Sequence, residues 1–517
     1  MSNKQISQRF FDETVRDNIE LLELSVDEAI DETFHSFTME GVDLSNIVKD
    51  MVKYIKGHPC ELALKRLCYL LECNPVNYAE LLNCIQELTK LCDVDLAHRK
   101  LLFSLSVLDF LGPAISKCTV ANERHCLIQL LTFIEAVASD QPEIFQSSSG
   151  EELLKALIQL FSESVNFVEG DNVTIEVTAM LYAVFRVACI QNEPNRRVLA
   201  QSDVLSRTLA LLSLLNLSSG DVDNASKCLL VRHSCRFLRA MTLDDDMNVV
   251  FGLGSENARQ IASTNAAMEI FLRLVRASIL ISNQRCLVDL FLALASVITR
   301  EEFCTQFRDL GGIELVFNTL EEYIDSPKVT SACLVLLRAL CNSDDCKRTA
   351  GLWHSNSLDG ECKTTGPGLI VDALERYIRN VFVARSAAAV IATLTLRQPD
   401  LADLIISAGA AEFLAKALQL HISDSATVRA VCIAIRNCVA RSTNLRGAFV
   451  GDTSTTDNSA MQCFKPDHRS DPYELETLLN IALQSPDCAD EAKAALRDLG
   501  LTVRLKELWR GNPVANL

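Results

Sequence analysis

The stretch that decides the fold reads IISAGAAEFLAKALQL at 405–420 and is followed by VRAVCIAIRNCVA at 428–440. After Gly409, apolar residues stand at 410, 413, 414 and 417, the i, i+3, i+4, i+7 spacing of an amphipathic helix. The second segment is apolar nearly all round, which predicts a helix that neighbours cover on every side. Glycine suits the sharp turn before the amphipathic helix, because it adopts the left-handed conformation without a Cβ clash. The pattern predicts a unit of short helix, glycine turn, amphipathic helix and buried helix.

The buried helix of this unit recurs along the chain. Its eight copies lie at 127–138, 176–189, 231–242, 286–298, 331–341, 384–396, 428–440 and 491–500. One aligned position in these copies holds Glu135, Arg186, Arg239, Ala295, Arg338, Ala392, Arg436 and Arg497. Successive spacings between 43 and 61 residues fit armadillo or HEAT units of roughly 40 to 47 residues that carry insertions. We therefore predict an all-α, right-handed superhelical solenoid of armadillo/HEAT type, built from three-helix repeats.

The chain divides into three parts by composition. Residues 1–54 form an acidic N-terminal helical segment, in which Ser25 and Glu28 have the spacing of a capping box and Gly41 is expected to end the helix. Residues 55–510 form the solenoid of about eight repeats, with inserted loops near 355–368 and 451–471 that are rich in Gly, Ser, Thr, Asp and Pro. Residues 511–517 are a C-terminal tail. The stretches at 55–120 and 252–285 follow the repeat pattern only loosely.

Composition narrows the class of protein further. The net charge is −18, and no run of four or more Lys or Arg is present, so the clustered positive charge expected of a nucleic-acid-binding protein is missing. No window approaches eighteen uninterrupted apolar residues, and no secretory pattern opens the chain, which predicts no membrane span and a reducing compartment, cytoplasmic or nuclear. The twenty cysteines lie mostly in apolar helical runs and lack zinc-site spacing, so no metal or other cofactor is expected. No phosphate loop, nucleophile elbow or His-Glu-x-x-His motif is present, so catalysis is not expected.

Three further stretches carry a family resemblance. They are FFDETVRDNIE with GVDLSNIV near the N-terminus, FLRAMTLDDDMNVVFG at 237–252, and EAKAALRDLGLTVRLKELW at 491–509. These stretches resemble the armadillo repeat-containing protein 6 family, and FRDLGGIELVFNTL at 307–320, like the two stretches quoted first, resembles armadillo repeats in general. The resemblance implies an armadillo fold and adds little about mechanism.

The recurrence of arginine is the first candidate for a binding site. Arg186, Arg239, Arg338, Arg436 and Arg497 occupy one place per unit, so their side chains should form a row along the solenoid that could grip carboxylates or peptide carbonyls. The alternative is that each arginine packs its stem on apolar neighbours and ties adjacent repeats together. In armadillo proteins that carry nuclear import signals, the binding groove is lined by a Trp and, four residues later, an Asn on the buried helix of successive repeats. Here only Asn437 matches and no Trp is present, so recognition of basic import signals is not expected.

Acidic residues gather just after the buried helices, as at Asp140, Glu301-Glu302, Asp344-Asp345 and Asp400. They form either a negative edge that meets a basic partner or caps of the next helix. Asp244, Asp245 and Asp246 exceed what one cap needs and are the first candidates for an acidic binding site.

These patterns predict a non-catalytic, monomeric scaffold or adaptor that binds a peptide or helix of another protein along the groove. The candidate residues are Arg186, Arg239, Arg338, Arg436 and Asn437. The alternatives are a folding or assembly factor that cradles a partner domain through its acidic edge and N-terminal helices, and an enzyme with an unrecognised site.

Overall fold

The computed structural model describes residues 4–54, 56–164, 172–218, 224–264, 266–355, 364–450 and 472–503. Three predicted features lie wholly or partly outside them: the inserted loop at 451–471, the tail at 511–517, and residues 356–363 of the other predicted loop. The chain forms two compact units, 1–265 and 266–517, and each is described here by itself. The described residues form α-helices, short 3₁₀ turns and two isolated bridges, Gln5 with Asp43 and His354 with Thr365.

The N-terminal segment is a helical hairpin with a small core of its own. It contains α1 (Gln8–Leu22), α2 (Val26–Met39) and the 3₁₀ turn η1 (Met51–Lys53). The predicted capping box is present at the start of α2: the Ser25 hydroxyl accepts the N–H of Glu28, and the Glu28 carboxylate accepts the N–H of Ser25. Phe11, Val15, Ala29 and Ile30 form the buried core of the hairpin.

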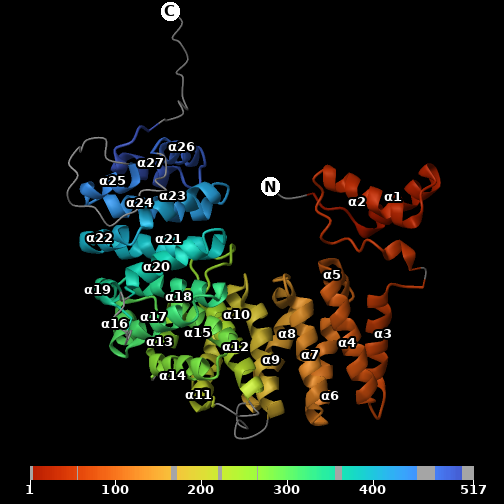
Figure 1. Cartoon of the computed structure of the whole chain (residues 1–517). Coiled ribbons are helices and arrows are strands. Elements are labelled where there is room, and N and C mark those ends of the chain that lie inside the picture. Colours follow the sequence, from red (N-terminus) through yellow and green to blue (C-terminus); the bar gives the residue numbers. More distant parts are fainter. Residues whose placement is uncertain are drawn as a thin grey trace, which may run out of the picture. The chain divides into compact units, whose positions relative to one another are not determined.

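The rest of unit 1 consists of repeats whose helices come in the predicted order. The helices are α3 (Pro59–Glu72), α4 (Tyr78–Val94), α5 (Leu96–Ser104), α6 (Leu108–Val120), α7 (Arg124–Ala138), η2 (Ile144–Gln146), α8 (Ser148–Ser164), α9 (Asn172–Cys189), α10 (Glu193–Gln201), α11 (Val204–Leu214), α12 (Asn224–Met241) and α13 (Gly254–Ser263). The last helix of each repeat, called the third helix below, packs beside the next one, from α4 to α7, α9 and α12 (Figure 1).

Unit 2 continues the same pattern. Its helices are α14 (Ala267–Leu280), α15 (Gln284–Val297), α16 (Glu301–Asp309), α17 (Gly312–Glu322), α18 (Pro327–Leu340), α19 (Asp344–Leu352), α20 (Gly366–Arg376), α21 (Val381–Thr395), α22 (Pro399–Ser407), α23 (Ala410–Leu420), α24 (Ser425–Val439), η4 (Thr443–Leu445), α25 (Arg446–Val450), α26 (Pro472–Ala482) and α27 (Ala489–Leu499). Here the third helices α15, α18, α21, α24 and α27 pack in sequence.

The core lies where the third helices meet their neighbours. All eight buried helices predicted from the sequence are third helices of the structure, and α4 is a further one that the pattern did not single out. In α9, every residue from Val177 to Cys189 is buried apart from Arg186. A helix surrounded in this way must be apolar on all sides, which confirms the interpretation of its sequence.

The sharp turns between first and second helices explain why some stretches matched the pattern poorly. Gly311 and Gly409 take the left-handed conformation, with φ of +76° and +94°, as predicted. The equivalent turns at Ser106, Asp203 and Ala266 also have φ between +56° and +58°, without glycine. Ser106 and Ala266 lie in the two stretches that fit loosely, because a search for glycine cannot find a turn built by another residue.

One described helix, α9, is long and apolar enough to cross a membrane, and the bent pair α5 and α6 would pass the same test if it were a single span. Other helices bury 78% of α9, which is the environment of a core helix in a solenoid.

Candidate functional site

The predicted arginine row begins with an ion pair inside unit 1. Arg186 on α9 lies 3.0 Å from the carboxylate of Glu135 on α7, and both side chains are partly buried. The two residues hold the same aligned position in successive repeats, so the structure brings neighbouring members of the row together. Arg239 on α12 is half-buried and also engaged with neighbouring groups. The contact between Arg186 and Glu135 therefore ties two successive repeats together.

In unit 2 the row has both paired and exposed members. Arg436 on α24 lies 3.6 Å from Asp498 on α27, and Asp498 also pairs with Arg497 at 2.8 Å. The side-chain amide of Asn437 donates to the carbonyl of Ala392 on α21 at 2.7 Å, so it binds the preceding repeat.

Arg338 on α18 differs from the rest of the row. It is exposed, and no hydrogen bond or ion pair joins its side chain to another described residue. At the same aligned position, the adjacent third helices carry Ala295 and Ala392, whose small side chains offer no competing charge. The Arg338 guanidinium is therefore available to an external carboxylate.

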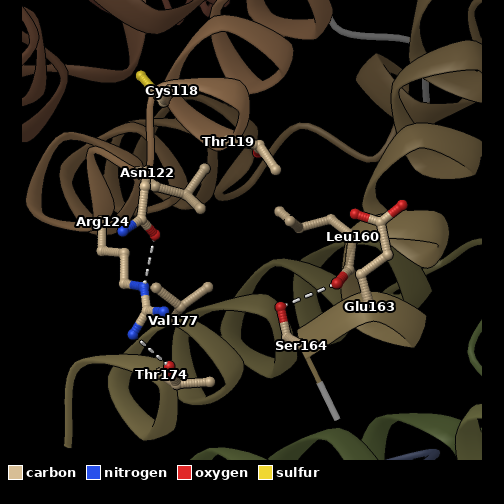
Figure 2. Close-up of a pocket in the computed structure, with 10 residues that line it drawn as sticks. Cys118, Thr119, Asn122, Arg124, Leu160, Glu163, Ser164, Thr174 and Val177 are labelled. Atoms are coloured by element: carbon tan, nitrogen blue, oxygen red, sulfur yellow. Dashed lines mark hydrogen bonds between the residues drawn. The ribbon is translucent and has the colours of Figure 1, made fainter. Parts of the chain in front are cut away.

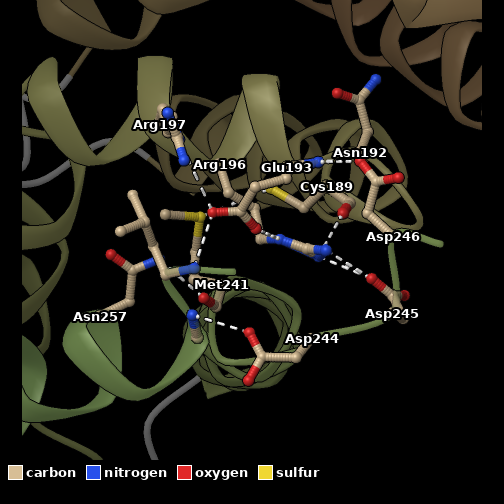
Figure 3. Close-up of polar contacts among 12 residues, drawn as sticks. Cys189, Asn192, Glu193, Arg196, Arg197, Met241, Asp244, Asp245, Asp246 and Asn257 are labelled. Atoms are coloured by element: carbon tan, nitrogen blue, oxygen red, sulfur yellow. Dashed lines mark hydrogen bonds and ion pairs between the residues drawn. The ribbon is translucent and has the colours of Figure 1, made fainter. Parts of the chain in front are cut away.

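The acidic triplet at 244–246 anchors its own loop to the start of α10 (Figure 3). Asp245 accepts hydrogen bonds from both terminal nitrogens of Arg196, at 2.7 and 2.5 Å, and from the N–H of Gln191 at 3.1 Å. Asp246 accepts the N–H of Glu193 at 2.9 Å, and this bond holds the pKa of the Asp246 carboxyl below its ordinary value. Asp244 accepts the N–H of Gly254 at 3.1 Å. All three carboxylates therefore bind groups of unit 1.

Glu193 and Arg196 form the buried centre of this arrangement. The Arg196 side chain has no exposed surface, that of Glu193 is 2% exposed, and Arg196 Nε lies 2.9 Å from Glu193 Oε2. Arg196 Nη1 also donates to the carbonyl of Cys189 at 3.0 Å, and Glu193 Oε1 accepts the N–H of Leu253 at 2.8 Å. Such a pair is tolerated in a buried place because further hydrogen bonds satisfy both partners. We call Glu193, Arg196 and Asp244–Asp246 the carboxylate anchor.

A cation on the first helix recurs in other repeats, and sequence reasoning missed it. Arg99 on α5 donates to the carbonyls of Cys92 and Ser139 and pairs with Asp140 at 3.2 Å. Arg308 on α16 reaches Asp345 at 3.2 Å, and Lys347 on α19 reaches the Leu396 carbonyl at 3.3 Å. In each case the cation holds the chain just after the third helix of its repeat. A basic residue seven positions after a cysteine in the last turn of a third helix, as in Cys92 to Arg99 and Cys189 to Arg196, was the available signal.

Other acids of the predicted negative edge have a local role. Glu301-Glu302, Asp344-Asp345 and Asp400 lie in the first turns of α16, α19 and α22. Carboxylates at this position complement the positive end of the helix dipole. This is the capping alternative of the sequence interpretation.

Unit 1 also contains a cavity of about 160 Å³ between α6, α7, α8 and α9 (Figure 2). Arg124 faces it, but its guanidinium already donates to Asn122 at 3.0 Å and to Thr174 at 2.8 Å. Burial raises the pKa of the lining thiol, Cys118, to about 12, so it stays protonated and poorly nucleophilic at neutral pH. Small-molecule pockets usually occupy roughly 300 to 1,000 Å³, so this cavity is small for a substrate site.

Among the described residues, Asp50, His58 and His98 form a group whose ligand atoms are close enough together to hold a metal ion. Nδ1 of His58 accepts the N–H of Cys60 at 3.2 Å, so the proton of the neutral ring lies on Nε2, 3.5 Å from Asp50. Burial and the neighbouring His98 lower the pKa of His58, which favours that neutral ring. A metal would need a lone pair at Nε2, where the proton lies. A structural contact fits this group better: Asp50 lies beside His58 Nε2, and the rings of His58 and His98 pack with their centroids 4.8 Å apart.

The fold and the contacts between its repeats define the class of protein: an α-solenoid of the armadillo type. Comparison with protein families agrees. The ARMC6 family model matches residues 70–516, and the model of the armadillo repeat-containing protein 6 N-terminal domain matches residues 3–61. The chain belongs to the armadillo repeat-containing protein 6 family.

Individual relatives are similar across most of their length. The chain is 27% identical to human armadillo repeat-containing protein 6, over 78% of this chain and 76% of the human one. It is 29% identical to the Drosophila melanogaster homolog, over 76% and 78% of the two chains. Similar solved structures include one from a study of the phosphorylation switch in the cadherin and beta-catenin interaction (TM-score 0.46, 14% identity, 95% and 100% covered) and an engineered protein (TM-score 0.43, 15%, 85% and 99%). Membership of an armadillo-repeat family indicates, in general terms, a scaffold for protein interactions.

Proposed function

We propose that this protein is a non-catalytic scaffold that holds an acidic peptide or helix of another protein along the third helices of unit 2. The observation that carries the proposal is Arg338, an exposed guanidinium on α18 with alanine on both sides in the row. A guanidinium presents a rigid fork of donors that fits a carboxylate in bidentate fashion. The stacked third helices of armadillo repeats form a continuous surface, and Arg338 presents its donors on that surface.

The charge of the neighbouring third helices supports an acidic partner. Arg429 and Arg436 lie seven residues apart on α24, and Lys493 and Arg497 lie four apart on α27, so each pair shares one face of its helix. All four are exposed. Glu491 and Asp498 neutralise part of this charge. The remaining cations stand out on a chain whose net charge is −18, and they would attract an acidic segment.

The alternative, a folding or assembly factor that uses its acidic edge, has less support, because Asp244, Asp245 and Asp246 already accept internal hydrogen bonds. The same proposal includes a monomeric protein in a reducing compartment, cytoplasmic or nuclear, without nucleic-acid or membrane partners. The cysteines of the described residues, all free thiols, suit such a compartment.

The proposal is tested by reversing one charge in the full-length protein. Arg338→Glu should remove a specific partner from affinity capture followed by mass spectrometry, and a synthetic peptide covering the acidic segment of that partner should bind at least tenfold more weakly. Arg300→Glu is the matched control, because Arg300 is also exposed in unit 2 but precedes α16 rather than lying on a third helix. Equal capture and equal peptide affinity for both variants would reject the proposal.

A further inference from the structure

The loop between α12 and α13 exposes an unusual amount of apolar surface. Met247 is 96% exposed, Val250 87% and Phe251 84%, all within five residues. Leu243, at the start of the same loop, is 41% exposed. Single exposed apolar side chains are common on protein surfaces and need no explanation. Three large exposed apolar side chains at the tip of one loop do need an explanation.

The same loop is held more firmly than an ordinary connection. The carboxylate anchor fixes it from both sides: Asp245 and Asp246 bind the first turn of α10, and Glu193 binds the N–H of Leu253. The loop also closes on itself, because Asp244 accepts the N–H of Gly254 and Asp246 accepts the N–H of Asn248 at 3.0 Å.

Glycine is required where the loop passes the anchor. A Cβ atom at Gly252 would lie 2.3 Å from Asp244 Oδ1, and one at Gly254 would lie 2.7 Å from the same oxygen. Larger residues would therefore push the loop away from its carboxylate. The carboxylates, the two glycines and Arg196 together hold the backbone of 244–254, while the apolar side chains between them point to solvent.

We propose that Met247, Val250 and Phe251 form a docking knob that inserts into an apolar pocket, bordered by Lys or Arg, on another protein. A fixed backbone lowers the entropy lost on binding, and exposed aromatic and methionine side chains are the kind that dominate interface energies. The border is argued from charge: Asp244 beside the knob is exposed, and the chain as a whole is acidic, so a basic rim on the partner complements it. A second copy of this chain, with its net charge of −18, is disfavoured as the occupant by repulsion.

This knob goes beyond the proposed function. It lies in unit 1, it enters a partner rather than receiving one, and it does not use the arginine row. The Arg338→Glu variant should therefore leave knob binding unchanged, and the two proposals fail independently.

The first measurement uses the photo-crosslinking amino acid p-benzoylphenylalanine in place of Phe251 in the full-length protein, in cell lysate. The same probe in place of Val120 is the control, because Val120 is 86% exposed on α6 but stands apart from the loop. We expect a crosslink specific to position 251 that maps to an apolar pocket of one partner with Lys or Arg at its border. A crosslink to a second copy of this chain, or the same products from both positions, would overturn the proposal.

The second measurement uses that partner in purified form. The Met247→Ser, Phe251→Ser double variant should bind it at least tenfold more weakly by calorimetry, with unchanged circular dichroism and melting temperature. Val120→Ser with Leu214→Ser, two exposed helix positions of unit 1, should bind within twofold of the original chain. Binding of the original chain should also weaken as salt is raised. Equal affinities for the two double variants would overturn the proposal.

Discussion

The guanidinium group of Arg196 is wholly buried, although the protein as a whole carries a net negative charge. Its charge is compensated by Glu193 and Asp245, and its Nη1 also donates to the carbonyl of Cys189. Burying an ion is costly, and the cost is offset only when each partner keeps its hydrogen bonds. Removing one member therefore leaves the others buried with uncompensated charge.

We predict that Arg196→Met lowers the free energy of unfolding by about 3–5 kcal/mol, because Glu193 remains 2% exposed and loses the buried cation that lies 2.9 Å from it. Arg197→Met is the adjacent control: its side chain is 53% exposed and lies 4.0 Å from Glu193, so the expected change is within about 0.5 kcal/mol. Urea unfolding of both full-length variants measures the difference. Similar midpoints for the two variants would mean that the anchor contributes no special stability.

At the scale of elements, the turn from first to second helix is a fixed left-handed corner, whatever residue occupies it. Gly409 reaches φ of +94° at little conformational cost, whereas Ser106 holds φ of +57° with a Cβ atom. Stacking of the repeats imposes this corner. A residue that disfavours the left-handed conformation therefore keeps the same turn and is strained in it.

Substitutions at these corners should have opposite signs. Ser106→Gly should raise the free energy of unfolding by about 0.5–1 kcal/mol, because Ser106 is exposed and the substitution changes only the cost of holding the left-handed backbone conformation. Gly409→Ala should lower it by about 1 kcal/mol, although a Cβ there meets nothing closer than Phe413 at 3.9 Å. Chemical unfolding of the two variants tests this. A shift in the same direction for both would contradict the conformational argument.

At the scale of the whole molecule, cysteine serves as a small apolar residue where helices pack closely. Sixteen of the eighteen described cysteines are buried. Burial raises the pKa of Cys60 and Cys92 to about 12 and that of Cys84 to about 11, so their reactive thiolate forms are scarce at neutral pH.

We predict that only Cys68 and Cys73 among the described cysteines react quickly with iodoacetamide at pH 8, because both are half-buried. A thiol of pKa about 12 is ionised in roughly one molecule in ten thousand at that pH, and burial also blocks access. Mass spectrometry of labelled peptides from the folded and the urea-unfolded protein measures each site. Rapid labelling of Cys333 or Cys438 in the folded protein would show that the repeats open readily.

The sequence by itself determined the helical solenoid, because a helix buried on every side must be apolar all round, and that pattern is local and repeats. It located the third helices from α7 to α27, the glycine corners at 311 and 409 and the capping box at Ser25. It also identified the row that contains Arg186 and Arg436, because the recurrence of arginine at one aligned position of the repeats can be read from the sequence.

Only the tertiary structure decided which charges are used internally. Asp245 pairs with Arg196 across 49 residues, and Glu135 with Arg186 across 51, because stacking brings equivalent places of neighbouring helices together. The same stacking gave Asp244, Asp245 and Asp246, predicted as an acidic binding site, hydrogen bonds within unit 1, and left Met247 and Phe251 exposed beyond them. Pairing between distant charges depends on distance in space, which a local pattern does not contain.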